Sequence, residues 1–192
     1  MDEPRQILFD HIRCVVPVDE RMEALLTEHT TVERFARHTD IYRGGQTVRK
    51  MYFLTAGLTK SSCYDDHGRE HVLSFAYEDW WEADYLAFLG ETRTEVTLRT
   101  LEATTAVGFT LSAYWTLCDE IPSLERFFLH KATRGYAASQ QRILSLMTEG
   151  PAARYYRLLA AQPRLVGRVS KTQLAAYLGV SRETLSRLRR GK

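Results

Sequence analysis

Four side chains near the C-terminal end combine residue types and spacing that suit the reading of DNA bases. They are Arg182, Glu183, Ser186 and Arg187. Steps of three and four residues place them on one face of a helix. Arginine pairs with guanine, glutamate accepts a hydrogen bond from the cytosine amino group, and serine bonds to several bases. This face therefore predicts sequence-specific contacts with base edges.

The residues around this face predict a helix-turn-helix. Ser170 and Gln173 form a capping box that begins a first short helix. Gly179 suits a turn that needs a left-handed residue, and Ser181 can cap the second helix. The apolar residues that would join the two helices are Leu174, Ala175, Leu178, Leu185 and Leu188. The alternative interpretation is a basic surface hairpin of helices that has no role in DNA binding.

The segment SRETLSR, residues 181–187, resembles the recognition helix of the catabolite-activator and fumarate-nitrate regulator (Crp/Fnr) superfamily of bacterial transcription factors. The resemblance implies that a helix over roughly residues 181–190 enters the major groove of double-stranded DNA. It also implies an inverted-repeat site with a TGA-like core, in which Arg187 reads the guanine and Glu183 the paired cytosine. The segment matches the base-reading positions of both branches of the superfamily, which leaves the exact half-site open.

Positive charge is concentrated in the last part of the chain. The formal charge of the whole sequence is +2, but residues 164–192 hold eight basic residues and one acid. That segment therefore carries +7, and residues 1–163 carry −5. Such asymmetry is typical of nucleic-acid binding. The side chains expected to contact DNA phosphates are Arg168, Lys171, Thr172, Ser181, Arg189, Arg190 and Lys192.

The region from Thr31 to Trp115 has the pattern of a β-domain. Short β-branched and aromatic runs alternate with turn residues, and residues 65–68 form a strong hairpin turn. Several short strands this close together predict a compact roll or barrel. A helix with one apolar face is expected before them, over residues 18–30.

A long helix is expected after the β-region. Residues 123–147 contain no proline, keep apolar residues at helical spacing, and include a stretch of small residues where another helix could approach closely. Gly150-Pro151 would end this helix, a further helix would cover residues 152–161, and residues 163–167 would form a linker. Since a long helix between two small domains needs a partner for its apolar stripe, we expect self-association.

The order and sizes of these regions also resemble the Crp/Fnr superfamily, over essentially the whole chain. The resemblance implies an α+β fold whose residues 1–118 form a β-roll (jelly roll) like a cyclic-nucleotide-binding domain. A dimerisation helix over residues 119–149 and a helix-turn-helix domain over residues 150–192 would follow, with no evident wing. We expect a homodimeric transcription regulator that binds double-stranded DNA, contacts RNA polymerase and has no enzymatic activity.

The superfamily binds cyclic nucleotides through a Gly-Glu pair, a short helix and an Arg-Ser pair, and the counterpart here is expected over residues 79–102. Glu82 matches the glutamate, but Trp81 stands in the glycine position and Thr94-Glu95 in the Arg-Ser position. A carboxylate there repels a phosphate, and the guanidinium that would grip it is missing. We therefore expect no cyclic nucleotide as cofactor, although Arg93 lies one residue away. An unidentified small ligand would meet a pocket formed by Trp81, Glu82, Tyr85, Arg93 and Arg99.

The composition argues against several other classes of protein. Three scattered cysteines form neither a disulfide framework nor an iron–sulfur site, and His67 and His71 fit a solvated hairpin better than a metal site. No catalytic cluster, membrane span or signal peptide is visible, so a cytoplasmic location is expected. Two hypotheses from other classes stay open: a cupin-like domain that binds a small molecule, and an adaptor whose basic tail binds an acidic protein.

Overall fold

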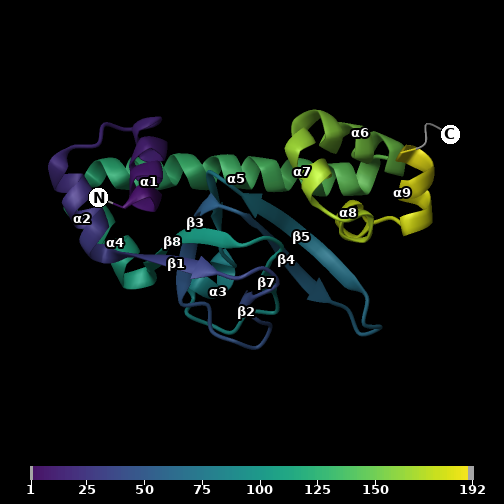
Figure 1. Cartoon of the computed structure of the whole chain (residues 1–192), viewed down its shortest axis with the longest axis horizontal. Coiled ribbons are helices and arrows are strands. Elements are labelled where there is room, and N and C mark those ends of the chain that lie inside the picture. The colour runs from purple at the N-terminus through teal and green to yellow at the C-terminus, as the bar shows by residue number, and fades with distance from the viewer. Residues whose placement is uncertain (1, 190–192) are drawn as a thin grey trace. The chain divides into compact units, whose positions relative to one another are not determined.

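The structure, a computed structural model, describes residues 2–189 (Figure 1). Its helices are α1 (Glu3–Arg13), α2 (Glu20–His29), α3 (Tyr85–Leu89), α4 (Leu111–Glu120), α5 (Pro122–Thr148), α6 (Pro151–Ala161), α7 (Pro163–Arg168), α8 (Lys171–Leu178) and α9 (Arg182–Arg189). Its strands are β1 (Thr30–Phe35), β2 (Asp40–Tyr42), β3 (Lys50–Ala56), β4 (Leu58–Tyr64), β5 (Glu70–Tyr77), β6 (Trp80–Glu82), β7 (Thr97–Thr100) and β8 (Thr104–Thr110).

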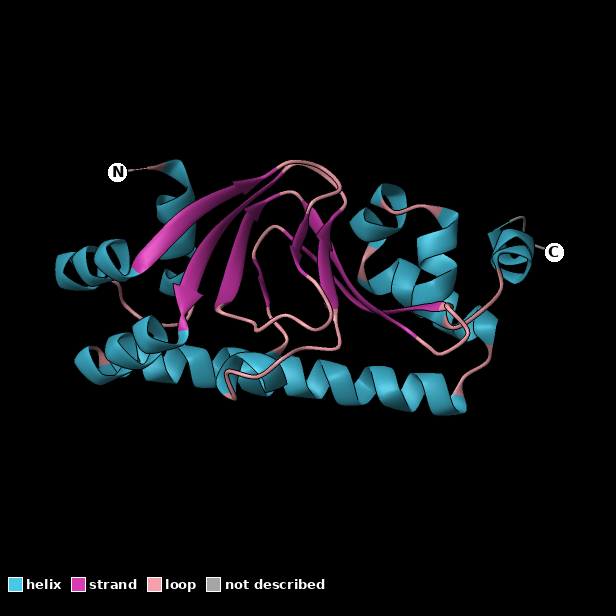
Figure 2. Cartoon of the chain, turned by 90° about the horizontal axis from the view of Figure 1, so that it is seen from below, coloured by secondary structure: helices cyan, strands magenta, loops and turns pink. Residues whose placement is uncertain are grey.

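The strands form the β-roll that the sequence predicts. They make two four-stranded antiparallel sheets, in the orders β1-β8-β3-β6 and β2-β7-β4-β5. Figure 2 shows the strands curving around into a roll. In the first sheet, β3 is central because it pairs with β8 on one side (Met51 opposite Phe109) and with β6 on the other (Phe53 opposite Trp81).

The chain divides into two compact units. The first contains the residues up to Ser61 together with Phe75–Ala132. The second contains Ser62–Ser74, which is the tip of the β4–β5 hairpin, together with the chain from Thr133 onward. The predicted hairpin turn is confirmed, since Asp65 N donates to Arg69 O at 3.1 Å and Gly68 has a φ of 72°.

Each unit has a core of its own. In the first unit, α1 buries one apolar face (Leu8, Phe9 and Ile12) against the roll, where Phe53 and Phe109 are fully buried. In the second unit, the helices from α6 to α9 bury Tyr155, Leu158, Leu165, Val166, Leu174, Leu178 and Leu185. Each apolar stripe recurs every three or four residues, as a helix with one buried face requires.

The structure corrects the sequence analysis at two places. Residues 111–115 belong to helix α4 and not to a strand, because the Thr110 hydroxyl caps the helix by accepting a hydrogen bond from Ala113 N at 3.1 Å. Residues 163–167 are not a linker but most of α7. Pro163 suits the first turn of a helix, and Leu165 and Val166 bury the apolar face that stabilises it.

Candidate DNA-binding surface and effector pocket

Helices α8 and α9 form the helix-turn-helix that the sequence predicts. The capping box is present, since Gln173 N donates to Ser170 Oγ and Ser170 N donates to Gln173 Oε1, both at 3.2 Å. Gly179 ends α8 with a φ of 65°, in the left-handed region where a side chain would be strained. Thr184 N then donates to Ser181 Oγ at 3.1 Å and begins α9. The second helix packs on α8 and α6, with Leu185 fully buried.

The side chains predicted to read bases lie along the open face of α9. Arg182, Glu183 and Arg187 are exposed, and Ser186 is half-buried. The Arg187 guanidinium donates to Thr184 Oγ1 at 3.4 Å, a weak contact that aligns it along the helix. Hydrogen bonds from its own backbone N–H and from the Ser181 hydroxyl lower the pKa of Glu183, and the nearby arginines lower it further. Glu183 is therefore ionised at neutral pH, as an acceptor for a cytosine amino group must be.

The predicted phosphate contacts surround the ends of these helices. Lys171, Thr172 and Ser181 are exposed near the N-termini of α8 and α9, and Arg168 is half-buried at the end of α7. Arg189 is the last residue of α9. Arg190 and Lys192 lie outside the described residues. Backbone N–H groups at helix N-termini favour anions, so these positions suit contact with a phosphate backbone.

Trp81, which the sequence places in the effector pocket, packs into an aromatic cluster of the first unit. Its ring centroid lies between 5.1 and 5.8 Å from those of Phe53, Phe109, Phe127 and Phe128. Its Nε1 donates to His11 Nε2 at 3.3 Å, which gives the indole N–H a partner. These contacts account for the position of Trp81 by packing within the first unit, so no ligand is needed to explain it.

The other predicted pocket residues fall into separate places. Glu82 is buried, and burial together with the charge of Glu82 raises the pKa of Tyr85. The Tyr85 hydroxyl donates to Met51 Sδ at 3.6 Å. Arg99 Nη1 lies 3.3 Å from Asp40 Oδ1, and Arg93 is exposed. Arg99 is therefore engaged by a carboxylate on the neighbouring strand β2.

The counterpart of the phosphate-binding cassette is occupied by a carboxylate of the chain itself. Asp84 caps α3, accepting from Ala87 N at 3.2 Å and from the Thr94 hydroxyl at 2.5 Å. Its backbone N donates to the Tyr42 hydroxyl at 2.9 Å. Thr94 is buried. A phosphate placed at the start of α3 would meet this negative charge, which disfavours it.

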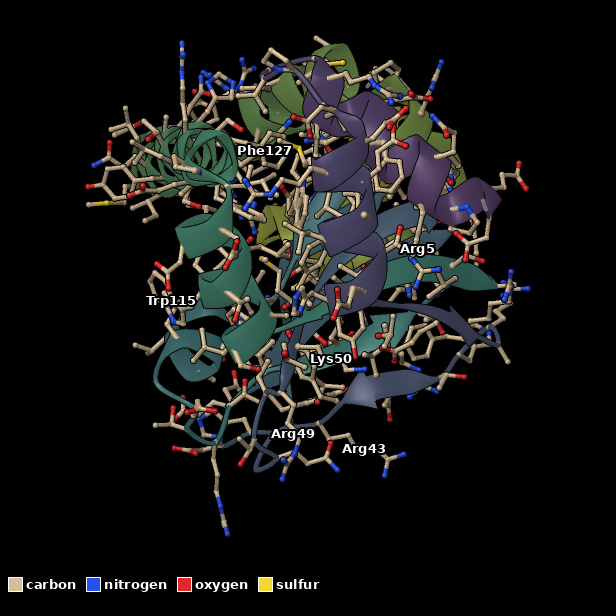
Figure 3. The ribbon with its side chains drawn as sticks, turned by 90° about the vertical axis from the view of Figure 1, so that its left-hand side faces the viewer. Arg5, Arg43, Arg49, Lys50, Trp115 and Phe127 are labelled. Carbon is tan, nitrogen blue, oxygen red and sulfur yellow. The ribbon has the colours of Figure 1, made fainter. Side chains whose placement is uncertain are left out.

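A cavity of about 440 Å³ lies elsewhere in the first unit, beside β2 and β3. Its lining is Ile41, Tyr42, Gln46, Thr47, Arg49, Lys50 and Tyr52, which includes none of the predicted pocket residues. Lys50 Nζ binds Glu33 Oε1 at 2.7 Å. Figure 3 shows Arg43 and Arg49 directed away from the ribbon on this side. The volume falls within the range of small-ligand sites.

Helix α5 buries one face and leaves another open. Phe127 is fully buried and points from α5 into the core of the first unit (Figure 3). Leu129, Tyr136 and Ile143 follow one another at seven-residue spacing and are 66%, 65% and 57% exposed. Residues seven apart lie almost in line along a helix. A side chain built at Gly135 would meet nothing within 4 Å, so space for a second helix is free there.

Sequence reasoning missed three residues that matter in this arrangement, namely Asp84, Thr184 and Arg142. Asp84 and Thr184 have a local signature, because each stands close in sequence to the groups that it contacts. Arg142 has no local signature in the sequence, because it binds backbone carbonyl groups of residues far away along the chain. Within residues 2–189, no three metal-binding side chains gather, and none of the helices has the length and apolarity of a membrane span.

No protein-family model and no curated protein matches this sequence. Solved structures do match. CLP of Xanthomonas campestris, described as a c-di-GMP-responsive global regulator, is 20% identical, with a TM-score of 0.71 over 90% of this chain and 91% of that one. FixK2 of Bradyrhizobium japonicum is 16% identical, with a TM-score of 0.72 over 84% and 83% of the two chains.

A transcriptional regulator of the Crp/Fnr family from Eubacterium rectale is 15% identical, with a TM-score of 0.70 over 90% of this chain and 82% of that one. At these low identities, the TM-scores of 0.70–0.72 show a common fold. The β-roll, the long helix and the C-terminal helix-turn-helix are therefore those of the Crp/Fnr-type transcription regulators, and that fold is the one this chain adopts.

Proposed function

We propose that this protein is a sequence-specific, DNA-binding transcription regulator that acts as a homodimer on an inverted-repeat site. The observation that carries the proposal is the complete helix-turn-helix, whose second helix leaves Arg182, Glu183 and Arg187 open to solvent. These groups match base edges in the major groove. The fold shared with regulators such as CLP and FixK2 supports the same function.

The helix-turn-helix would make two kinds of contact with DNA. The open face of α9 (Arg182, Glu183, Ser186 and Arg187) would select bases. The predicted phosphate-binding residues, Arg168, Lys171, Thr172, Ser181, Arg189, Arg190 and Lys192, would bind phosphates on any sequence. Base contacts decide which site is chosen, and phosphate contacts decide how strongly binding depends on salt.

A second copy of this chain is the partner that fits the open face of α5. Leu129, Tyr136 and Ile143 are large, exposed and spaced by seven residues, as in the seam between two paired helices. Pairing would bury them and set two recognition helices beside each other, about one turn of DNA apart. In this proposal residues 1–118 form the sensor domain, 119–149 the dimerisation region and 150–192 the DNA-binding domain.

A small ligand of the β-roll would regulate the dimer, and a cyclic nucleotide held by the cassette is not that ligand. The support is Asp84, whose carboxylate caps α3 where a cyclic phosphate would have to bind. An effector would act by binding two dimer geometries with unequal affinity. The residues proposed to meet such a ligand remain Trp81, Glu82, Tyr85, Arg93 and Arg99, of which Tyr85 and Arg93 are exposed.

The test is selection from a randomised DNA library with the purified full chain at near-physiological salt and without ligand. Recovery of a two-fold symmetric motif would support the proposal, and the motif would decide between the half-sites of the two Crp/Fnr branches. The selection would be repeated with cyclic AMP and with c-di-GMP, to which the similar regulator CLP responds. Failure under every condition would contradict the proposal and favour a ligand-binding or adaptor protein.

We also propose that the protein acts in the cytoplasm and contacts RNA polymerase. Transcription from a promoter that carries the selected site would be measured with purified polymerase, with and without the protein. A change in transcript level that disappears when the site is scrambled would support a regulator. An unchanged transcript level would show that the protein binds DNA for another purpose.

A further inference from the structure

The side chain of Arg142 joins three elements of the second unit. It stands on α5, and its Nη2 donates to the carbonyl oxygen of Tyr177 at the end of α8 at 2.9 Å. The same nitrogen donates to the carbonyl oxygen of Val72 on β5, in the hairpin tip, at 3.0 Å. The guanidinium carbon also lies 3.7 Å from the centre of the Tyr177 ring.

The Arg142 guanidinium is surrounded by groups that carry no formal negative charge. Burial lowers the pKa of Arg142, and no described carboxylate forms an ion pair with it. Its charge is instead balanced by two carbonyl dipoles and the face of an aromatic ring. A planar guanidinium can stack flat on a ring and donate along its edge at the same time, whereas a lysine ammonium can donate to the two carbonyl groups but has no flat face to stack. The stacking on Tyr177 is therefore the part of the contact that is specific to arginine.

The position of Arg142 connects dimerisation to base reading. The next residue along α5, Ile143, belongs to the open stripe that a second copy would cover. Tyr177 is two residues before Gly179, where the turn into α9 begins. The orientation of α8 relative to α5 decides where α9 lies relative to the dimer axis. Arg142 acts on that orientation directly.

We propose that Arg142 is a positioning residue for DNA binding, which sets the separation of the two recognition helices and so the spacing of half-sites that the dimer accepts. The proposal rests on the dimeric function proposed above. The carbonyl of Val72 gives the contact a second anchor in the tip of the β4–β5 hairpin, so one side chain on α5 joins this tip to α8.

The experiment compares Arg142→Gln and Arg142→Lys in the full chain with the wild type and with Arg134→Gln. Arg134 is a matched control because it is an exposed arginine two turns earlier on the same helix. Binding is measured on the selected inverted repeat, on sites whose spacer is longer or shorter by one and two base pairs, and on a single half-site.

We expect the wild type and Arg134→Gln to prefer the selected spacing by roughly tenfold or more, because both helices then engage at once. Arg142→Gln should lower affinity at that spacing and bind the altered spacers almost equally, with half-site binding unchanged. Arg142→Lys should fall between the wild type and Arg142→Gln, since the ammonium can donate to the two carbonyl groups but cannot stack flat on the Tyr177 ring. An Arg142→Gln protein that keeps the wild-type spacing preference would overturn the proposal.

Amide hydrogen exchange on the free protein supplies a readout that does not depend on DNA. Loss of Arg142 should speed exchange in β5 and in α8 and leave the core of the first unit unchanged. Unchanged exchange in both elements, with normal DNA binding, would overturn the role of Arg142 alone. Absence of wild-type binding to any selected DNA would instead overturn the regulator function, and with it this role.

Discussion

In the proposed DNA-binding role, individual side chains of the helix-turn-helix matter because their hydrogen-bonding groups remain available for bases. Arg187 makes only one weak hydrogen bond, to Thr184, so most of its donors remain available for a base. Glu183 is held ionised by its own backbone N–H and the Ser181 hydroxyl, and its charge is therefore ready for a donor. Leu185, between them, is fully buried and keeps both side chains directed outward.

Arg187→Ala should weaken binding to the selected site by about 1–3 kcal/mol and relax the choice of base at one position. The reason is the loss of a bidentate contact to a guanine edge. Competition binding against all four bases at each position measures both effects. Lys171→Ala is the control, because loss of a phosphate contact should weaken every sequence alike and flatten the salt dependence. Equal weakening of all sequences by Arg187→Ala would contradict its base-reading role.

His11 makes folding stability depend on pH. Burial, with a smaller effect of the charge of Lys131 and an opposing effect of Asp79, lowers its pKa from 6.5 to about 4. Between those two pH values the unfolded chain binds a proton that folded His11 does not, so stability is present above pH 6.5 and is lost as the pH falls toward 4. The loss should amount to at most about 3 kcal/mol.

The check is urea unfolding of the wild type and of His11→Gln at pH 7 and at pH 4.5. The amide of glutamine keeps an acceptor for Trp81 and does not titrate, so the variant should lose less stability on acidification. Equal losses in the two proteins would show that His11 is not the group responsible.

Individual elements form where local rules and burial agree. The first helix of the helix-turn-helix, the left-handed glycine after it and the β4–β5 turn were all predicted, because capping and turn formation depend on residues within four positions of one another. Helices α4 and α7 were missed. Both are short, and their apolar residues are as compatible with strand or linker as with helix until tertiary packing buries them.

Ser170→Ala should destabilise the helix-turn-helix by about 0.5–2 kcal/mol, because α8 would lose the side-chain acceptor that caps its N-terminus. Amide hydrogen exchange in α8 and α9 measures this destabilisation. Thr172→Ala, one residue into the same helix and exposed, should change exchange little. Equal effects of the two substitutions would show that the cap contributes nothing.

At the scale of the whole molecule, α5 takes part in the core of one chain and offers the face on which we propose that a second copy assembles. One side of the helix completes the core of the first unit through Phe127 and Phe128, and the stripe through Leu129, Tyr136 and Ile143 stays open. Burying that stripe against a second copy would remove large apolar side chains from water. In the proposed dimer, this stripe would be the surface that joins the two copies.

Ile143→Glu should dissociate the dimer, since two carboxylates would face each other across the seam. Sedimentation equilibrium would show the mass of one chain, and affinity for the inverted repeat would fall to that of a half-site. Arg134→Glu introduces the same residue on the other side of the helix and should leave the dimer intact. A dimeric Ile143→Glu protein would place the interface elsewhere.

The sequence alone determined the helix-turn-helix, the β-roll and the long helix, because caps, turns and apolar periodicity are local properties. Only the tertiary structure decided that Trp81 completes an aromatic core, that Asp84 caps the helix of the cassette, and that Arg142 reaches carbonyl groups 35 and 70 residues away. Every residue carries a carbonyl group, so a sequence cannot indicate which one a distant side chain will bind. That choice is made when packing brings the segments together.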